Sequence, residues 1–167
     1  MKKRRYSYLF LLGLLVCFIR TEGAAQVAPP IRTERETYEV KYTRNSVKLT
    51  IKTSYTNRTG DTVYLSKCRV PSEPILQKRV RGRWILAYER PQLLCREKPV
   101  RIKPGETYKD RFQMEAFLPG NNNFPKFEVR EVPGTYRLVR SFHRGSDEGP
   151  LLPLRERVSN QFQLVGE

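Results

Sequence analysis

The residues that could carry out chemistry are few, and the single histidine, His143, is the first to consider. Ser141 and Asp147 lie close to it in the sequence, and a Ser-His-Asp set can activate a serine as a nucleophile. Residues at such a short spacing along a strand seldom form this relay, and the chain contains no Gly-x-Ser-x-Gly nucleophile elbow. We therefore predict no catalytic residue and interpret His143 as a polar side chain near a strand edge.

Metal and cofactor binding are not expected either. A copper or zinc site needs several histidine, methionine or cysteine ligands. Beyond residue 25 the chain offers only His143, Met114, Cys68 and Cys95. It also lacks a Gly-rich loop that could hold a phosphate. The sequence therefore predicts neither a metal nor a cofactor.

Two converging carboxylates could still hydrolyse a glycosidic bond, because the two acids need not be neighbours in sequence. Asp110, Glu115, Glu128 and Glu131 are candidates in that general sense. With 32 Lys and Arg against 17 Asp and Glu, ion pairing at the surface is the simpler role for these acids. A small secreted hydrolase is an alternative to our prediction that the protein is not an enzyme.

The clearest candidate for binding is the short run that ends at the only tryptophan, Trp84. Lys78, Arg79, Arg81 and Arg83 precede it, and such cations can bind phosphates or sulfates while an indole ring stacks on a base or a sugar. We interpret these five residues as a candidate polyanion-binding site. The alternative is a solvated hairpin tip with Trp84 in the core.

The net charge bounds the class of partner. At pH 7 the chain carries a formal charge of +15, and a charge of that size attracts anions. The partners we consider are an unknown envelope protein and an anionic surface polymer, such as lipopolysaccharide or an acidic polysaccharide. The cations are spread along the chain, which favours the alternative of a basic, solvated surface without a dedicated polyanion ligand. Specific recognition of nucleic acid is not expected.

Residues 1–25 have the layout of a signal peptide. Four basic residues at 2–5 are followed by an apolar run over 8–19 and by small residues at 23–25. The apolar run is shorter than the roughly 20 residues that a membrane helix needs, and no later segment is long and apolar enough to span a bilayer. We predict an exported protein, periplasmic or extracellular; retention of this segment as an anchor is the alternative.

The cysteines agree with export. Cys17 lies inside the predicted signal peptide, which leaves Cys68 and Cys95 as a pair in an oxidising compartment. The chain contains no Cys-x-x-Cys motif, which would have indicated a metal or redox site instead. We therefore predict one disulfide between Cys68 and Cys95.

The chain after the signal peptide has the pattern of strands. Residues 26–36 contain Pro29-Pro30 and no period, so we expect a flexible lead-in. From 47 to 55 apolar and polar residues alternate, which indicates a strand with one buried face. Residues 57–61 have turn chemistry, although Asn57-Arg58-Thr59 is also a glycosylation sequon.

A hairpin is expected around Arg81-Gly82-Arg83. A three-residue loop would set Val80 opposite Trp84 and gather their apolar neighbours on one face, whereas a two-residue loop would set Arg79 opposite Trp84. We predict the three-residue loop. Further strand patterns and long loops follow, at 62–69, 107–117, 135–139 and 158–165 for the strands and 118–127 and 145–153 for the loops.

About eight or nine short strands without a helical period predict an all-β fold, an antiparallel β-sandwich forming one domain over residues 37–167. Two motifs, Pro104-Gly105-Glu106 and Pro133-Gly134-Thr135-Tyr136, resemble those of the immunoglobulin-like sandwiches of exported bacterial proteins. The second is similar to a tyrosine corner, in which the tyrosine hydroxyl bonds to the upstream backbone. The cysteine that antibody domains carry two residues after this tyrosine is replaced by Leu138.

The resemblance implies a non-enzymatic exported module that acts by protein or polyanion binding in the cell envelope. The layout is also similar to the bacterial intracellular proteinase inhibitor type of sandwich. That likeness implies an alternative, a proteinase-inhibitor-like domain in which the loop 118–127 would enter a protease cleft.

Overall fold

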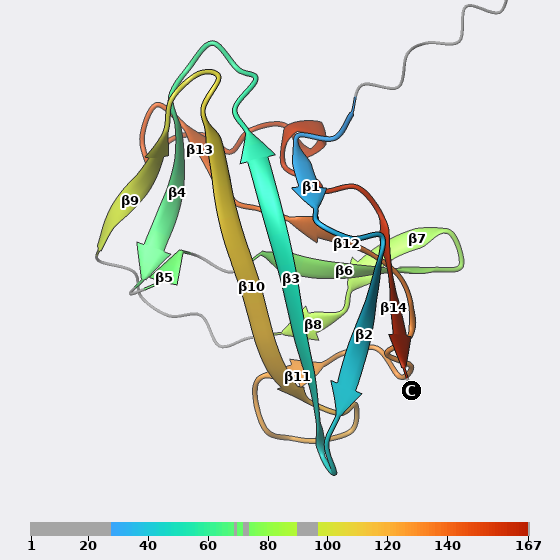
Figure 1. Ribbon diagram of the computed structural model, residues 1–167. Coiled ribbons are helices and arrows are strands. Elements are labelled where there is room, and N and C mark those ends of the chain that lie inside the picture. Colours follow the sequence, from blue (N-terminus) through green and yellow to red (C-terminus); the bar gives the residue numbers. More distant parts are fainter. Residues whose placement is uncertain (1–27, 69, 72–73, 90–96, 167) are drawn as a thin grey trace, which may run out of the picture.

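The computed structural model describes residues 28–68, 70–71, 74–89 and 97–166. These residues form strands and one short 3-10 helix, η1 (Leu154–Glu156), so the prediction of an all-β fold is confirmed (Figure 1). Within the same residues, no helix has the length and apolar character of a membrane span. The predicted signal peptide, Cys95 and the side chain of Cys68 lie outside what is described, and the disulfide stays a prediction.

A large, strongly curled sheet holds most of the strands (Figure 1). Its centre is the antiparallel pair β3 (Ser46–Thr56) and β10 (Thr107–Phe117), and β1 (Ile31–Thr33) also pairs with β3. The order across the sheet is β7 (Arg83–Leu86), β6 (Ile75–Val80), β12 (Gly134–Val139), β14 (Phe162–Gly166), β2 (Thr37–Tyr42), β3, β10, β11 (Lys126–Phe127) and β8 (Tyr88–Glu89).

A smaller sheet lies beside one end of this large sheet. In it β4 (Val63–Cys68) pairs with three antiparallel neighbours, which are β13 (Phe142–Arg144), β9 (Glu97–Ile102) and β5 (Val70–Pro71). The described residues therefore form two sheets, which the loops 57–62 and 103–106 connect.

The prediction of a wholly antiparallel fold was wrong at two pairings. The C-terminal strand β14 runs parallel to β2, and β11 runs parallel to the end of β10. The large sheet is therefore mixed. An alternating pattern reports which face of a strand is buried, but it carries no information about the direction of a neighbour that arrives from a distant part of the chain.

The inside of the curl is the main hydrophobic core. Its curvature brings the apolar faces of β6 and β12 over those of β3 and β10, as the crossing of these strands shows in Figure 1. Burying one such aliphatic or aromatic side chain stabilises the fold by roughly 1.5–3 kcal/mol. The largest contributors include Ile51, Leu76, Phe112, Phe127, Tyr136, Leu138 and Phe162.

A second, smaller core lies between β1, the end of β3 and the small sheet. Tyr55 stacks on Phe142 with ring centroids 4.0 Å apart, and Ile31 of β1 is buried in the same cluster. Residues 26–36 were expected to be a flexible lead-in, yet residues 31–33 form β1. The reason is that Ile31 supplies an apolar side chain that this second core buries.

The tyrosine of the Pro133-Gly134-Thr135-Tyr136 motif makes the hydrogen bond that its resemblance to a tyrosine corner implies. Tyr136 is fully buried, and its hydroxyl donates to the carbonyl oxygen of Val132. A buried phenol needs such a partner, because an unpaired hydroxyl in the core costs free energy. This bond ties the start of β12 to the preceding loop.

The predicted three-residue loop of the β6–β7 hairpin was wrong. The register pairs Arg79 with Trp84 and Val80 with Arg83, which leaves the two-residue turn Arg81-Gly82. Both turn residues have positive φ, 48° and 80°, the combination that suits the twist of a tight hairpin. Apolar burial did not set the register here because Val80 is exposed on the projecting hairpin.

The turn yields a prediction on stability. An arginine at positive φ is strained, whereas asparagine before glycine is favoured in this turn. Arg81→Asn should therefore raise the free energy of unfolding in urea by about 0.5–1 kcal/mol. Arg83→Asn removes the same charge from a strand position and should give no gain; equal gains in both variants would contradict the explanation.

Candidate functional site

The predicted hairpin site divides between the inside and the outside of the molecule. Lys78 is only 8% exposed, and its ammonium group donates to the carbonyl oxygen of Glu131 and lies 5.9 Å from the ring centre of Tyr136. Burial lowers the pKa of Lys78, and the Glu131 carboxylate opposes this shift. A Cβ at Gly134 would lie 2.7 Å from the Lys78 Cε, so glycine there leaves room for the chain.

The other four residues of that site face outward or are half-buried. Arg79, Arg81 and Arg83 are exposed around the turn. Trp84 is half-buried rather than in the core, and the Arg137 guanidinium lies 4.4 Å from its ring centre, a cation–π contact. One face of the indole is thus covered by a cation of the protein itself.

A second basic surface lies on the outer face of the large sheet, and sequence reasoning did not identify it. Residues directly opposite one another on antiparallel strands share a face, so the register of β1, β2, β3 and β10 places a set of exposed cations together. We call this set the basic face; it consists of Arg32, Lys41, Lys48, Lys52, Lys109 and Arg111.

Like charges stand directly across from each other on the basic face. Lys41 is opposite Lys48, and Lys52 is opposite Arg111. Such pairs are unfavourable in an isolated sheet. Same-face residues follow one another about 7 Å apart along a strand and about 5 Å apart across strands. An extended anion lying on this surface would relieve the repulsion.

Acidic neighbours compensate for only part of this charge. Glu115 lies 3.1 Å from the Lys48 ammonium and Glu34 lies 3.2 Å from that of Lys52. Both ion pairs are about half exposed, so each contributes little to stability. In the part of the chain that the structure describes, Lys109 and Arg111 form no ion pair.

A cavity of about 700 Å³ opens between the segment at residues 28–30, the loop 58–61 and η1. Tyr55 and two prolines supply apolar walls, while three arginines and two carboxylates supply polar ones. Arg58 donates to the carbonyl oxygen of Ala28, and the Arg144 Nε lies 3.4 Å from the Asp61 carboxylate. These polar groups therefore hold the cavity wall together.

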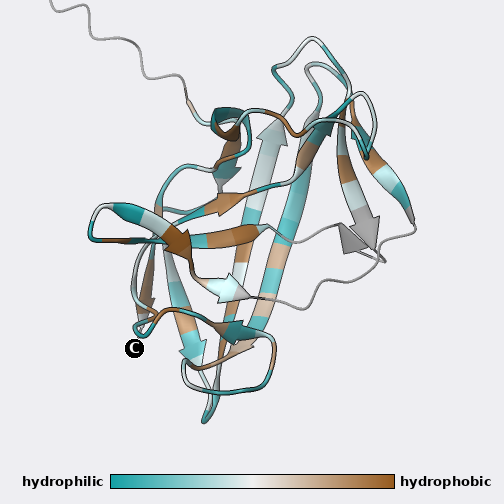
Figure 2. Ribbon diagram, turned by 180° about the vertical axis from the view of Figure 1, so that it is seen from behind, coloured by the Kyte–Doolittle hydropathy of each residue, from teal (hydrophilic) through white to brown (hydrophobic). Residues whose placement is uncertain are grey.

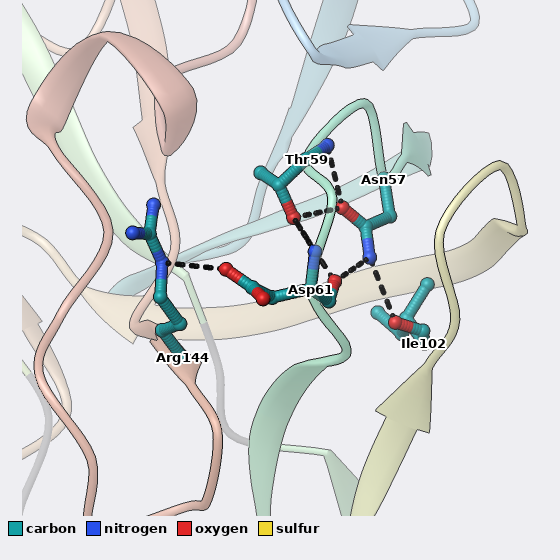
Figure 3. Close-up of polar contacts among 5 residues, drawn as sticks. All are labelled: Asn57, Thr59, Asp61, Ile102 and Arg144. Carbon is teal, nitrogen blue, oxygen red and sulfur yellow. Dashed lines mark hydrogen bonds and ion pairs between the residues drawn. The ribbon is translucent and has the colours of Figure 1, made fainter.

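The loop beside the cavity is held by the side chain of Asn57, which is fully buried (Figure 3). Its amide nitrogen donates to the carbonyl oxygens of Asp61 and Ile102 at 2.8 and 2.9 Å. Its amide oxygen accepts from the backbone nitrogen and the hydroxyl of Thr59. The interpretation of residues 57–61 as a turn is confirmed, and both ends of the sequon amide are used inside the fold.

Three of the four acids that could have formed a catalytic pair are in ion pairs. Asp110 pairs with the buried Arg140, Glu115 with Lys48, and Glu128 with Lys126. His143, for which the sequence predicts no catalytic role, is hydrogen-bonded through Nδ1 to the carbonyl oxygen of Gly149 at 2.8 Å. Among the described residues, no three His, Cys, Asp or Glu side chains gather as ligands for a metal ion.

The loop 118–127, expected to project in the inhibitor alternative, returns to the sheet. The nitrogen of Phe117 donates to the carbonyl oxygen of Pro125, that of Leu118 donates to Asn45, and β11 pairs with β10 and β8. Phe124 is the exposed apolar side chain on this loop.

Comparison with known proteins adds no relative: no protein-family model matches the chain, and no curated protein matches it in sequence.

Removing the Asn57 amide should destabilise the protein. Asn57→Ala removes the amide that donates to the carbonyl oxygens of Asp61 and Ile102 and that accepts two hydrogen bonds from Thr59, so the free energy of unfolding should fall by about 2–4 kcal/mol. Asn122→Ala, at an exposed loop position, is the matched control and should change it little. Equal losses in chemical denaturation of the two variants would show that the network does not hold the loop.

Stability should also fall at alkaline pH through Tyr55. Burial, with a smaller contribution from Glu156, raises its pKa from 10.0 to about 12. Between these values the unfolded chain loses the phenol proton while the folded protein keeps it, so the free energy of unfolding decreases as pH rises. Tyr55→Phe should show a smaller decrease between pH 10 and 12; an unchanged decrease would exclude Tyr55 as a cause.

Proposed function

We propose that this protein is an exported, non-enzymatic module that binds an anionic polymer of the cell surface, and that the basic face is its binding surface. The observation that carries the proposal is the placement of Lys41 opposite Lys48 and of Lys52 opposite Arg111 on one exposed sheet face. Each pair of opposed cations destabilises the folded protein through repulsion. A bound polyanion would relieve this repulsion, and the free energy released would add to its affinity.

The geometry of the face suits a linear polymer. β3 and β10 pair along eleven residues each, so the face is long, and Thr50 and Gln113 add uncharged polar groups between the cations. Among the described residues, no acid pairs with Lys109 or Arg111, so none of these must be displaced before an anion binds. The hairpin offers fewer free cations because Lys78 turns inward, and its Trp84 ring already contacts Arg137.

Export and the likeness to immunoglobulin-like sandwiches belong to the same proposal. The Tyr136–Val132 hydrogen bond and the apolar core enclosed between two parts of the curled sheet support a sandwich-like body. A stable β-sheet domain with exposed cations can bind a surface polymer without any catalytic group. The module would act by binding alone.

The proposal can be tested by retention on immobilised heparin, used as a model sulfated polyanion. Lys109→Gln with Arg111→Gln removes two free cations from the basic face. We expect this variant to elute at clearly lower salt, and the slope of log affinity against log salt to decrease by about one for each cation that contacts the polymer.

Two control variants remove the same charge elsewhere. Arg81→Gln with Arg83→Gln tests the hairpin tip, and Lys98→Gln with Lys103→Gln tests exposed positions on and beside β9. Each should lose less retention than the variant of the basic face. Equal losses in all three would mean that heparin responds to net charge alone, and a larger loss in the hairpin variant would move the site to the turn.

A further inference from the structure

One edge of the large sheet is open. β7 ends the strand order, and among the residues that the structure describes no strand pairs with its second edge. An open edge presents backbone N–H and C=O groups that can pair with an extended segment of another chain. The chemistry of the side chains around β7 decides which segment could add there.

The register identifies the free backbone groups. Ala87 donates its N–H to the Leu76 carbonyl oxygen at 2.9 Å, and hydrogen-bonded and non-hydrogen-bonded pairs alternate along an antiparallel ladder. Ile85 therefore bonds to Lys78, whereas Trp84 and Leu86 direct their N–H and C=O groups away from β6. Two backbone donors and two acceptors thus point to the open side.

The hairpin is polarised along its length. Its exposed cations, Arg79, Arg81 and Arg83, lie toward the turn. Toward the base it exposes Ile85 and Leu86, at 40% and 45%. In Figure 2 the strand that returns from the turn changes from teal to brown toward its base. Successive strand residues point to opposite faces, so Ile85 and Leu86 flank the open edge on its two sides, and exposed apolar side chains on an unpaired edge favour the addition of another strand.

We propose that β7 binds an extended segment of a partner protein as an added strand, with acidic residues of the segment beside the arginines and apolar residues beside Ile85 and Leu86. Charge complementarity selects this occupant. A second copy of the chain paired in parallel would set arginine beside arginine, and in either direction the formal charge of +15 on each copy opposes the pairing. Charged side chains on the edge strands of natural sheets likewise prevent pairing with unsuitable strands.

The test uses short fluorescein-labelled peptides in fluorescence polarisation with the whole protein. Each peptide has aspartates in one half and alternating valine and threonine in the other, and a second peptide has the reversed order because strand addition can be parallel or antiparallel. Each is made in two N-methylated forms, methylated on odd or on even residues. One form should bind about tenfold more weakly than the other, since only one set of amides pairs with β7.

Two protein variants separate backbone pairing from charge. Leu86→Pro removes an outward N–H without breaking the β6–β7 ladder and should weaken peptide binding about tenfold, whereas Leu86→Ala keeps that N–H and should lose less. Lys109→Gln with Arg111→Gln should leave the tenfold difference between the two methylated forms unchanged, because attraction of the aspartates to the basic face does not depend on which amides are methylated. Circular dichroism checks that each variant is folded.

Three results would overturn the proposal. The first is the absence of binding by both peptides. The second is equal binding of the two methylated forms, and the third is equal binding by an all-aspartate peptide. The last two results would show that the arginines attract any polyanion and that no strand is added. Because the methylated peptides are tested on the unaltered protein, the outcome does not depend on whether Leu86→Pro folds.

Discussion

The antiparallel ladder between β3 and β10 determines which side of the molecule is apolar and which is charged. Both strands alternate strictly, and their register places Ile51 opposite Phe112 on one face and Lys52 opposite Arg111 on the other. A shift by one residue would bury the cations and expose the core. The core inside the curl and the basic face outside it are therefore two consequences of a single register.

The curl of the large sheet follows from the same ladder. Exposure of the apolar faces of these two long strands to water would be unfavourable. The sheet therefore curls, and β6, β12 and β14 cover those faces. The C-terminal strand β14 joins this closure by pairing in parallel with β2. The hairpin β6–β7 continues beyond β12, which explains why its apolar residues and its outer edge stay exposed.

Local patterns predicted what depends on neighbours along the chain. The alternation at 47–55 predicted β3 and its buried face, and the Asn57-to-Asp61 turn followed from residue types alone. The Tyr136 hydrogen bond also followed from a short motif. The hairpin loop was misjudged because we weighed apolar pairing above turn geometry, and at a projecting hairpin the positive φ of Arg81 and Gly82 decides the register.

The sequence by itself determined the all-β class, the excess of positive charge and the outward direction of Lys48 and Lys52, because strand periodicity and composition are properties of the chain. Tertiary structure alone decided that Arg111 lies across from Lys52, that Lys78 points inward, and that no strand of the described ranges pairs with the outer edge of β7. Pairing between strands depends on which segments meet in space. The pattern of residues within one strand does not specify which distant strand will be its neighbour.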